Sequence, residues 1–111
     1  MSNVNRQGVV TVVEVDQPLR QDEADLISLQ LDELESSGVP RIVVDLSQTP
    51  LIDGAGLQWL EDLDWRASDL GGSVRLCGAN ELCGDILWMT GLNDRLERFE
   101  TLSDAMASFV R

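Results

Sequence analysis

The chain has 111 residues, 43% of them hydrophobic, which is enough for one compact core and too few for two ordinary domains. Its 20 acidic residues outnumber 8 basic residues, all arginine, and give a formal net charge of −12. Nucleic acids and anionic membrane surfaces bind clustered Lys and Arg, so this charge excludes both as partners. It favours a basic protein partner, unless the charge serves solubility alone.

The pattern of apolar residues indicates no membrane segment. No apolar run approaches the roughly 20 residues that cross a bilayer, and no leader-like segment opens the chain. We therefore expect a cytoplasmic protein without direct membrane insertion.

The residue types that most chemistry requires are missing. Acid–base catalysis near neutral pH most often uses histidine, and the chain has no histidine, lysine or tyrosine. The phosphate-binding pattern GxxxxGK[ST] is absent as well. Cys77 and Cys83 match neither a CxxC redox pair nor a zinc site, and are expected to be buried, reduced thiols. We predict that the protein is not an enzyme and holds no metal or cofactor.

The first half of the chain alternates between strand and helix patterns. The β-branched run from Val9 to Val15 predicts a strand with little exposure on either face, ended by Pro18. A helix is predicted over 21–37, with acidic residues in its first turn and Gly38 and Pro40 after it. Its apolar positions are Ala24, Ile27, Leu31 and Leu34. The run over 42–46 predicts a central parallel strand, because helical patterns lie on both sides of it.

The alternation continues after the loop from Ser47 to Gly54. A second helix is predicted to end at Gly71-Gly72, and its core-facing positions are Leu57, Leu60, Leu63, Ala67 and Leu70. A short strand follows over 74–77. This order predicts an α/β sandwich with a central, mostly parallel sheet of four to five strands and about four helices.

The last third predicts two more helices and an edge strand. The third helix is expected over 81–90, with Gly91 as a left-handed terminator. Its predicted core positions are Leu82, Ile86 and Met89, with Trp88 also packed in the core. A segment around Phe99 predicts the edge strand, and Thr101 with Asp104 resembles a capping box. That final helix should turn Ala105, Met106 and Phe109 inward.

The segment from Asp45 to Leu57 is the strongest candidate for a binding site. It leaves the carboxyl end of a central strand and enters a helix, which is where parallel sheets gather binding loops. Asp53 is placed to cap that helix. Gly54 and Gly56 leave the corner without side chains, so another backbone or a ligand could approach, or the two glycines only permit a tight turn and close packing.

At this segment the sequence resembles the STAS domain family, and the resemblance extends over about 8–109. The matching residues are Asp45-Leu46-Ser47, Ile52-Asp53, Gly56-Leu57, Gly71-Gly72, Thr90-Gly91-Leu92 and Ala105. The resemblance implies a STAS-like fold, with residues 1–111 forming a single STAS domain that binds a protein partner, as bacterial anti-sigma factor antagonists do.

The resemblance also implies a switch that this chain lacks. In family members that antagonise anti-sigma factors, a partner kinase phosphorylates a serine in this loop and so ends binding, because phosphate brings charge into the interface. The matching position here is Ala55, which has no hydroxyl. The chain is then a permanently active antagonist, or takes its regulation from its partner, or belongs to a branch that never used the switch. Ser47 and Thr49 are nearby hydroxyls, but neither matches the family's site.

The implied partner is a kinase-type anti-sigma factor or a similar regulator in a bacterial partner-switching system. The alternative is an accessory STAS subunit bound to the ATPase of an ABC-type lipid transporter. In either case the expected partner-binding residues lie on the loop and the second helix. They are Asp53, Gly54, Ala55, Gly56, Leu57, Trp59, Asp62 and Trp65.

The tryptophans of the second helix differ in their expected positions. Trp65 falls opposite the core-facing stripe, and Trp59 falls at its margin. Because aromatic residues are enriched at interface centres, Trp65 is predicted to contact a partner or a second copy of the chain, unless a neighbouring segment covers it. Acidic residues make the outer face negative, which suits a solvated face or a basic partner whose binding weakens with salt. They are Asp62, Asp64 and Asp69.

Overall fold

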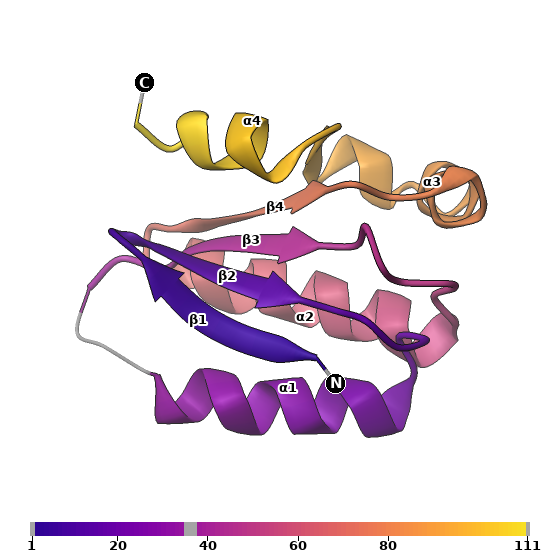
Figure 1. Ribbon diagram of the computed structural model, residues 1–111, viewed down its shortest axis with the longest axis horizontal. Coiled ribbons are helices and arrows are strands. Elements are labelled where there is room, and N and C mark those ends of the chain that lie inside the picture. Colours follow the sequence, from indigo (N-terminus) through magenta and orange to yellow (C-terminus); the bar gives the residue numbers. More distant parts are fainter. Residues whose placement is uncertain (1, 35–37, 111) are drawn as a thin grey trace.

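The computed structural model describes residues 2–34 and 38–110 and contains a five-stranded sheet in the order β1-β2-β3-β4-β5 (Figure 1). The strands are β1 (Asn3–Gln7), β2 (Val10–Glu14), β3 (Arg41–Asp45), β4 (Ser73–Cys77) and β5 (Glu97–Phe99). β1 pairs antiparallel with β2, and the remaining neighbours pair in parallel. The helices are α1 (Gln21–Glu33), α2 (Gly54–Asp69), α3 (Glu81–Met89) and α4 (Leu102–Ala107), with a 3₁₀ turn η1 (Leu92–Asp94) after α3. The predicted α/β sandwich with a mostly parallel sheet is confirmed.

Helices cover both faces of the sheet, which explains the continuous apolar runs of its central strands. Figure 1 shows α1 and α2 on one side of the sheet and α4 on the other. Val12 and Val43 pack toward α4, whereas Val13 and Val44 join the larger core beneath α1, α2 and α3. All four are fully buried. A strand that is buried on both faces has no polar alternation, as these sequences show.

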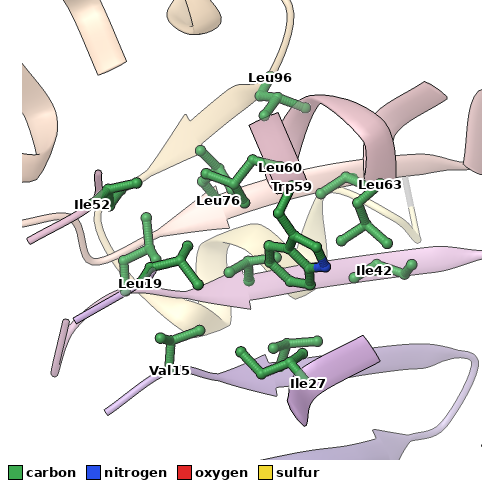
Figure 2. Close-up of a cluster of buried hydrophobic side chains, with 14 of the residues drawn as sticks. Val15, Leu19, Ile27, Ile42, Ile52, Trp59, Leu60, Leu63, Leu76 and Leu96 are labelled. Carbon is green, nitrogen blue, oxygen red and sulfur yellow. The ribbon is translucent and has the colours of Figure 1, made fainter. Parts of the chain in front are cut away.

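The larger core is built where α1 and α2 meet the sheet (Figure 2). Ile27 of α1 and Leu60 of α2 are fully buried in it, together with Leu19 from the segment between β2 and α1. The smaller cluster on the other face contains Ala105 of α4 and Cys77 of β4. The inward positions predicted for the first, second and last helices therefore fall largely where the periodicity placed them.

The N-terminal hairpin departs from the sequence prediction. β1 was not predicted, because its five residues are mostly polar and only Val4 is buried. It forms an antiparallel edge strand, in which one face can stay polar. Val9, predicted to begin a buried strand, is exposed in the turn with Gly8 that joins β1 to β2. The predicted end of the first helix, over 35–37, lies outside the described residues, and α1 ends at Glu33.

The core face predicted for α3 is wrong by one position. Cys83 and Leu87 are fully buried, whereas the predicted Leu82 and Met89 are exposed. Trp88, predicted to pack in the core, is 71% exposed. Apolar residues occur nearly all round this helix, so more than one helical stripe fits the sequence, and packing into the larger core selects the stripe through Cys83 and Leu87.

The Gly71-Gly72 pair ends α2 with a Schellman motif. Gly71 has a φ of +80°, and the Gly72 amide donates to the carbonyl oxygen of Ala67 at 2.8 Å. A Cβ at Gly72 would overlap the carbonyl oxygen of Pro40, which is where the chain enters β3. Leu70, predicted on the core stripe, is exposed, because α2 ends at Asp69 and Leu70 is its C-cap residue.

Candidate functional site

The loop between β3 and α2 is fastened to the segment that follows β2. The Leu19 amide donates to the Leu51 carbonyl at 2.9 Å, and the Asp53 amide donates to the Leu19 carbonyl at 3.2 Å. Leu19 and Ile52 form a parallel bridge beyond the ends of the named strands. The start of α2 is thus held by backbone contacts on a neighbouring segment, so its position does not depend on flexible side chains.

Thr49 anchors the same loop from inside. Its side chain is buried, and its Oγ1 donates to the Val15 carbonyl at 2.7 Å. Its own carbonyl accepts hydrogen bonds from Asn80 Nδ2 at 3.1 Å and from Cys83 Sγ at 3.5 Å. The Thr49 hydroxyl is therefore buried and hydrogen-bonded within the fold, and a kinase could reach it only after the loop opens.

Ser47 is the exposed hydroxyl of this loop. Its amide donates to the Asp45 carboxylate at 2.9 Å, which folds the chain back on itself. The surface hollow beside it is also lined by Glu14, Asp16 and Asp45. A phosphate on Ser47 would be placed among carboxylates, which disfavours it by like-charge repulsion.

Asp53 caps α2, as the sequence predicted. Its backbone is extended, with φ −97°, and its Oδ1 accepts from the Gly56 amide at 2.9 Å. The carboxylate satisfies one of the donors that the first turn of a helix leaves without an intrahelical partner, and its charge matches the positive end of the helix dipole.

Removing this cap should lower the stability measurably. We expect Asp53→Ala to reduce the free energy of unfolding by about 1 kcal/mol, while Asp53→Asn, which keeps the accepting oxygen, retains most of it. Urea titrations of the three proteins at neutral pH measure the difference. Equal losses in the two variants would show that the hydrogen bond from Gly56 contributes nothing.

The two glycines of the corner play different parts. Gly56 is buried, and a Cβ there would overlap the Leu19 carbonyl oxygen and lie 2.9 Å from Ile52 Cγ2. Its small size therefore serves the packing of this chain against itself. Gly54 is exposed, and a Cβ there meets nothing within 4 Å among the described residues. The bare surface of the corner consists of the exposed Gly54 and the half-buried Ala55. Leu57, two residues after Ala55, is also half-buried.

Trp65 lies on the outer face of α2, as predicted, and is 57% exposed. The guanidinium carbon of Arg95 is 5.1 Å from the centre of its ring, within cation–π range. Arg95 also forms ion pairs with Glu61 at 3.0 Å and with Asp64 at 3.4 Å. The indole is thus held in place by Arg95 while more than half of its surface remains available.

The remaining α2 residues of the predicted site divide between core and surface. Trp59 is only 8% exposed, and its Nε1 donates to Ser28 Oγ of α1 at 2.9 Å (Figure 2 shows the ring within the core). It holds α1 against α2 and is out of a partner's reach. Asp62 is exposed and accepts from Gln58 Nε2 at 2.9 Å. Asp69 is exposed as well, so the outer face of α2 carries negative charge beside Trp65.

The two thiols are free and buried, as predicted. The pKa of Cys77 is raised from 9.0 to about 12, first by burial and then by the neighbouring Asp45 carboxylate, which accepts a hydrogen bond from the thiol. Burial also raises the pKa of Cys83. A raised pKa disfavours the reactive thiolate, so neither cysteine is suited to nucleophilic or redox chemistry. Over residues 2–34 and 38–110, no group of His, Cys, Asp and Glu side chains could hold a metal ion.

Two residues near the site were missed by sequence reasoning. Asn80 caps α3 by accepting from the Cys83 amide at 2.8 Å, and it also ties this helix to the Thr49 carbonyl. An Asn directly before a helical pattern is a recognised capping signal that could have revealed it. Arg95 gave no such signal, because its ion pairs and its contact with Trp65 join segments distant in sequence.

The comparisons with known proteins agree with this architecture. A family model of the STAS domain matches residues 1–105. No curated protein matches the sequence. Within the described ranges, no helix has the length and apolar content needed to cross a bilayer.

Several solved structures share the fold. A Thermotoga maritima protein, described as a candidate anti-sigma factor antagonist, has a TM-score of 0.88 at 22% identity, over 99% of this chain and 95% of that one. An anti-sigma factor antagonist in its unphosphorylated form has a TM-score of 0.82 at 11% identity, over 98% and 96%. A sulfate transporter family protein from Wolinella succinogenes has a TM-score of 0.80 at 21% identity, over 92% and 85%. At these identities the likeness establishes the fold.

Proposed function

The chain belongs to the STAS domain family, and we propose that it is a non-catalytic binding module that acts as an anti-sigma factor antagonist in a bacterial partner-switching system. The whole chain, 1–111, would serve as one cytoplasmic domain. Its partner would be a kinase-type anti-sigma factor or a similar regulator, contacted through the start and the outer face of α2.

One observation carries the proposal: α2 begins with a firmly held corner that has almost no side chains. Gly54 is exposed and Ala55 is half-buried, while the Asp53 cap and the Leu19 contacts fix the backbone beneath them. Trp65 lies ten residues after Ala55 on α2, about 15 Å away along the helix axis at 1.5 Å per residue. A fixed backbone corner and an exposed aromatic side chain give a partner both a close approach and an anchor.

The electrostatics of this surface support a basic partner. Asp62 and Asp69 are exposed on the same helix, and the chain as a whole carries a net charge of −12. A partner that brings arginine or lysine to this face gains complementary charge and a faster association. The same surface repels polyanions such as nucleic acid.

Ala55 means that a phosphate cannot be added where antagonists carry serine. Because Ala55 has no hydroxyl, the corner is always unphosphorylated. Binding would then be regulated by the partner, or not regulated at all.

Serine at position 55 should restore the switch. If the partner is a kinase of the expected type, Ala55→Ser should become phosphorylated on incubation with the partner and ATP. Position 55 is half-buried and follows the exposed Gly54, so part of its side chain faces solvent. The wild-type chain, treated identically, should stay unmodified when both are examined by mass spectrometry. Phosphate on the wild-type loop, at Ser47 for instance, would contradict the proposal.

The alternative is an accessory STAS subunit bound to the ATPase of an ABC-type lipid transporter. It is supported by the fold that the chain shares with a sulfate transporter family protein. Affinity purification of the native protein, followed by mass spectrometry, separates the two. Recovery of a soluble kinase-like protein supports the first proposal and recovery of a transporter ATPase supports the second, whereas recovery of neither counts against both.

A further inference from the structure

Helix α3 carries a second apolar face that residues 2–34 and 38–110 leave uncovered. Cys83 and Leu87 point into the core, while Leu82, Ile86 and Met89 follow one another at helical spacing along a flank of the helix. Leu82 is 53% exposed and Met89 is 72% exposed, and Ile86 is half-buried. A helix that is apolar on several sides is typical of one that is enclosed by other chain segments.

Among the helices of the described residues, α3 has the highest density of large exposed apolar side chains. Leu82 and Met89 are exposed on this flank, and Trp88 is a third large exposed side chain on another side of the nine-residue helix. The thirteen-residue α1 shows two, Leu26 and Leu29. Single exposed apolar residues are ordinary, but a cluster of them on a short helix marks a contact surface.

The α3 surface joins the corner already described. Asn80, the cap of α3, and Cys83 in its first turn both donate to the carbonyl oxygen of Thr49, at 3.1 and 3.5 Å. Thr49 belongs to the loop that leads into Asp53 and α2. Figure 1 shows α3 at the same end of the molecule as the start of α2. The corner and α3 are therefore linked through the Thr49 loop and lie at the same end of the molecule (Figure 1).

The charges on α3 decide what kind of partner fits. Glu81 and Asp85 are exposed beside the apolar flank, and the helix contains no basic residue. On the other flank, Arg98 is engaged with the Gly84 carbonyl at 3.2 Å and with Asn93 Oδ1 at 3.1 Å. A second copy of the chain would bring the same two carboxylates to this surface together with its own charge of −12. Repulsion thus disfavours self-association here.

We infer that the face of α3 formed by Leu82, Ile86 and Met89, flanked by Glu81 and Asp85, binds an amphipathic helix of a protein partner that presents apolar residues bordered by arginine or lysine. Such a helix would cover the apolar flank and neutralise the two carboxylates. The inference rests on the proposed function only in that a protein partner exists. Its test uses no native partner, so its failure and that of the proposed function can be told apart.

The test uses a synthetic amphipathic helix built of leucine and lysine, and a matched peptide with glutamate in place of lysine. Calorimetric titration into the whole protein should show binding of the basic peptide and none of the acidic one. Leu82→Asn/Met89→Asn should weaken the basic peptide at least about tenfold, because two apolar contacts are lost. Leu26→Asn/Leu29→Asn, the matched control on α1, should leave the affinity unchanged.

A second pair of variants tests the charges. Glu81→Gln/Asp85→Asn should weaken binding and flatten its dependence on salt, whereas Asp32→Asn/Glu33→Gln on α1 removes the same charge and should have little effect. If the α3 and α1 variants lose the same amount of affinity, the peptide is held only by the net charge of the protein, and the inference is overturned. Sedimentation that reveals a dimer dissolved by Leu82→Asn/Met89→Asn would also overturn it, since a second copy would then cover α3.

Discussion

Gly56→Ala is expected to lower the free energy of unfolding by about 3 kcal/mol or more. The added methyl group would overlap the carbonyl oxygen of Leu19, which cannot simply withdraw, because it accepts from the Asp53 amide and Leu19 is bridged to Ile52. The strain must therefore open the contact between the two loops or displace the start of α2. Alanine's better helix propensity, worth up to about 1 kcal/mol, offsets only part of this.

Gly54→Ala provides the matched control two residues earlier. Its Cβ would enter open space, so the free energy of unfolding should stay the same or rise by up to about 1 kcal/mol. Urea unfolding followed by circular dichroism measures both variants. If Gly56→Ala is as stable as Gly54→Ala, the close packing of α2 on Leu19 is wrong, and with it the description of the corner as rigid.

Alkaline destabilisation is the second large expected effect. The chain has no Lys, Tyr or His, so between about pH 9 and 12 its two thiols are the side chains that titrate. The pKa of Cys77 is raised from 9.0 to about 12 by folding, so the unfolded chain loses the proton first as pH rises. Stability is then fully present below pH 9 and falls by about 1.4 kcal/mol per pH unit until about pH 12, with a further contribution from Cys83.

Urea titrations under reducing conditions, at intervals from pH 8 to 11, measure this slope. Cys77→Ala/Cys83→Ala should lose stability at pH 8, because it opens small gaps in both cores, but its stability should then change little with pH. An equally steep alkaline decline in that variant would assign the effect to groups other than the thiols. A flat wild-type profile would contradict the burial of Cys77.

The sequence predicts the fold well where each element has one apolar face. In α2, residues other than Trp65 on the outer side are polar, so the stripe through Leu60, Leu63 and Ala67 could have only one orientation, and all three are buried. In α3, two stripes were available, and only packing into the larger core selects Cys83 and Leu87 over Leu82 and Met89. β1 was missed because a solvated edge strand needs little apolar content.

The candidate site could be predicted only as far as local rules apply. The Asp53 cap depends on residues three positions apart and was predicted from the sequence. Position 56 requires glycine because a Cβ would overlap the Leu19 carbonyl oxygen, and Trp65 is held by its cation–π contact with Arg95. Both partners come from distant segments that only the folded topology brings close, so no local pattern could show them.

The proposed binding surface is tested most directly by nuclear magnetic resonance of the isotope-labelled chain, titrated with the partner recovered from its native source. The largest shifts are expected at the amides of Gly54 and Ala55 and at the indole N–H of Trp65, with the complex weakened by added salt. Shifts concentrated on α4, across the sheet, with these three signals unmoved, would contradict docking on α2.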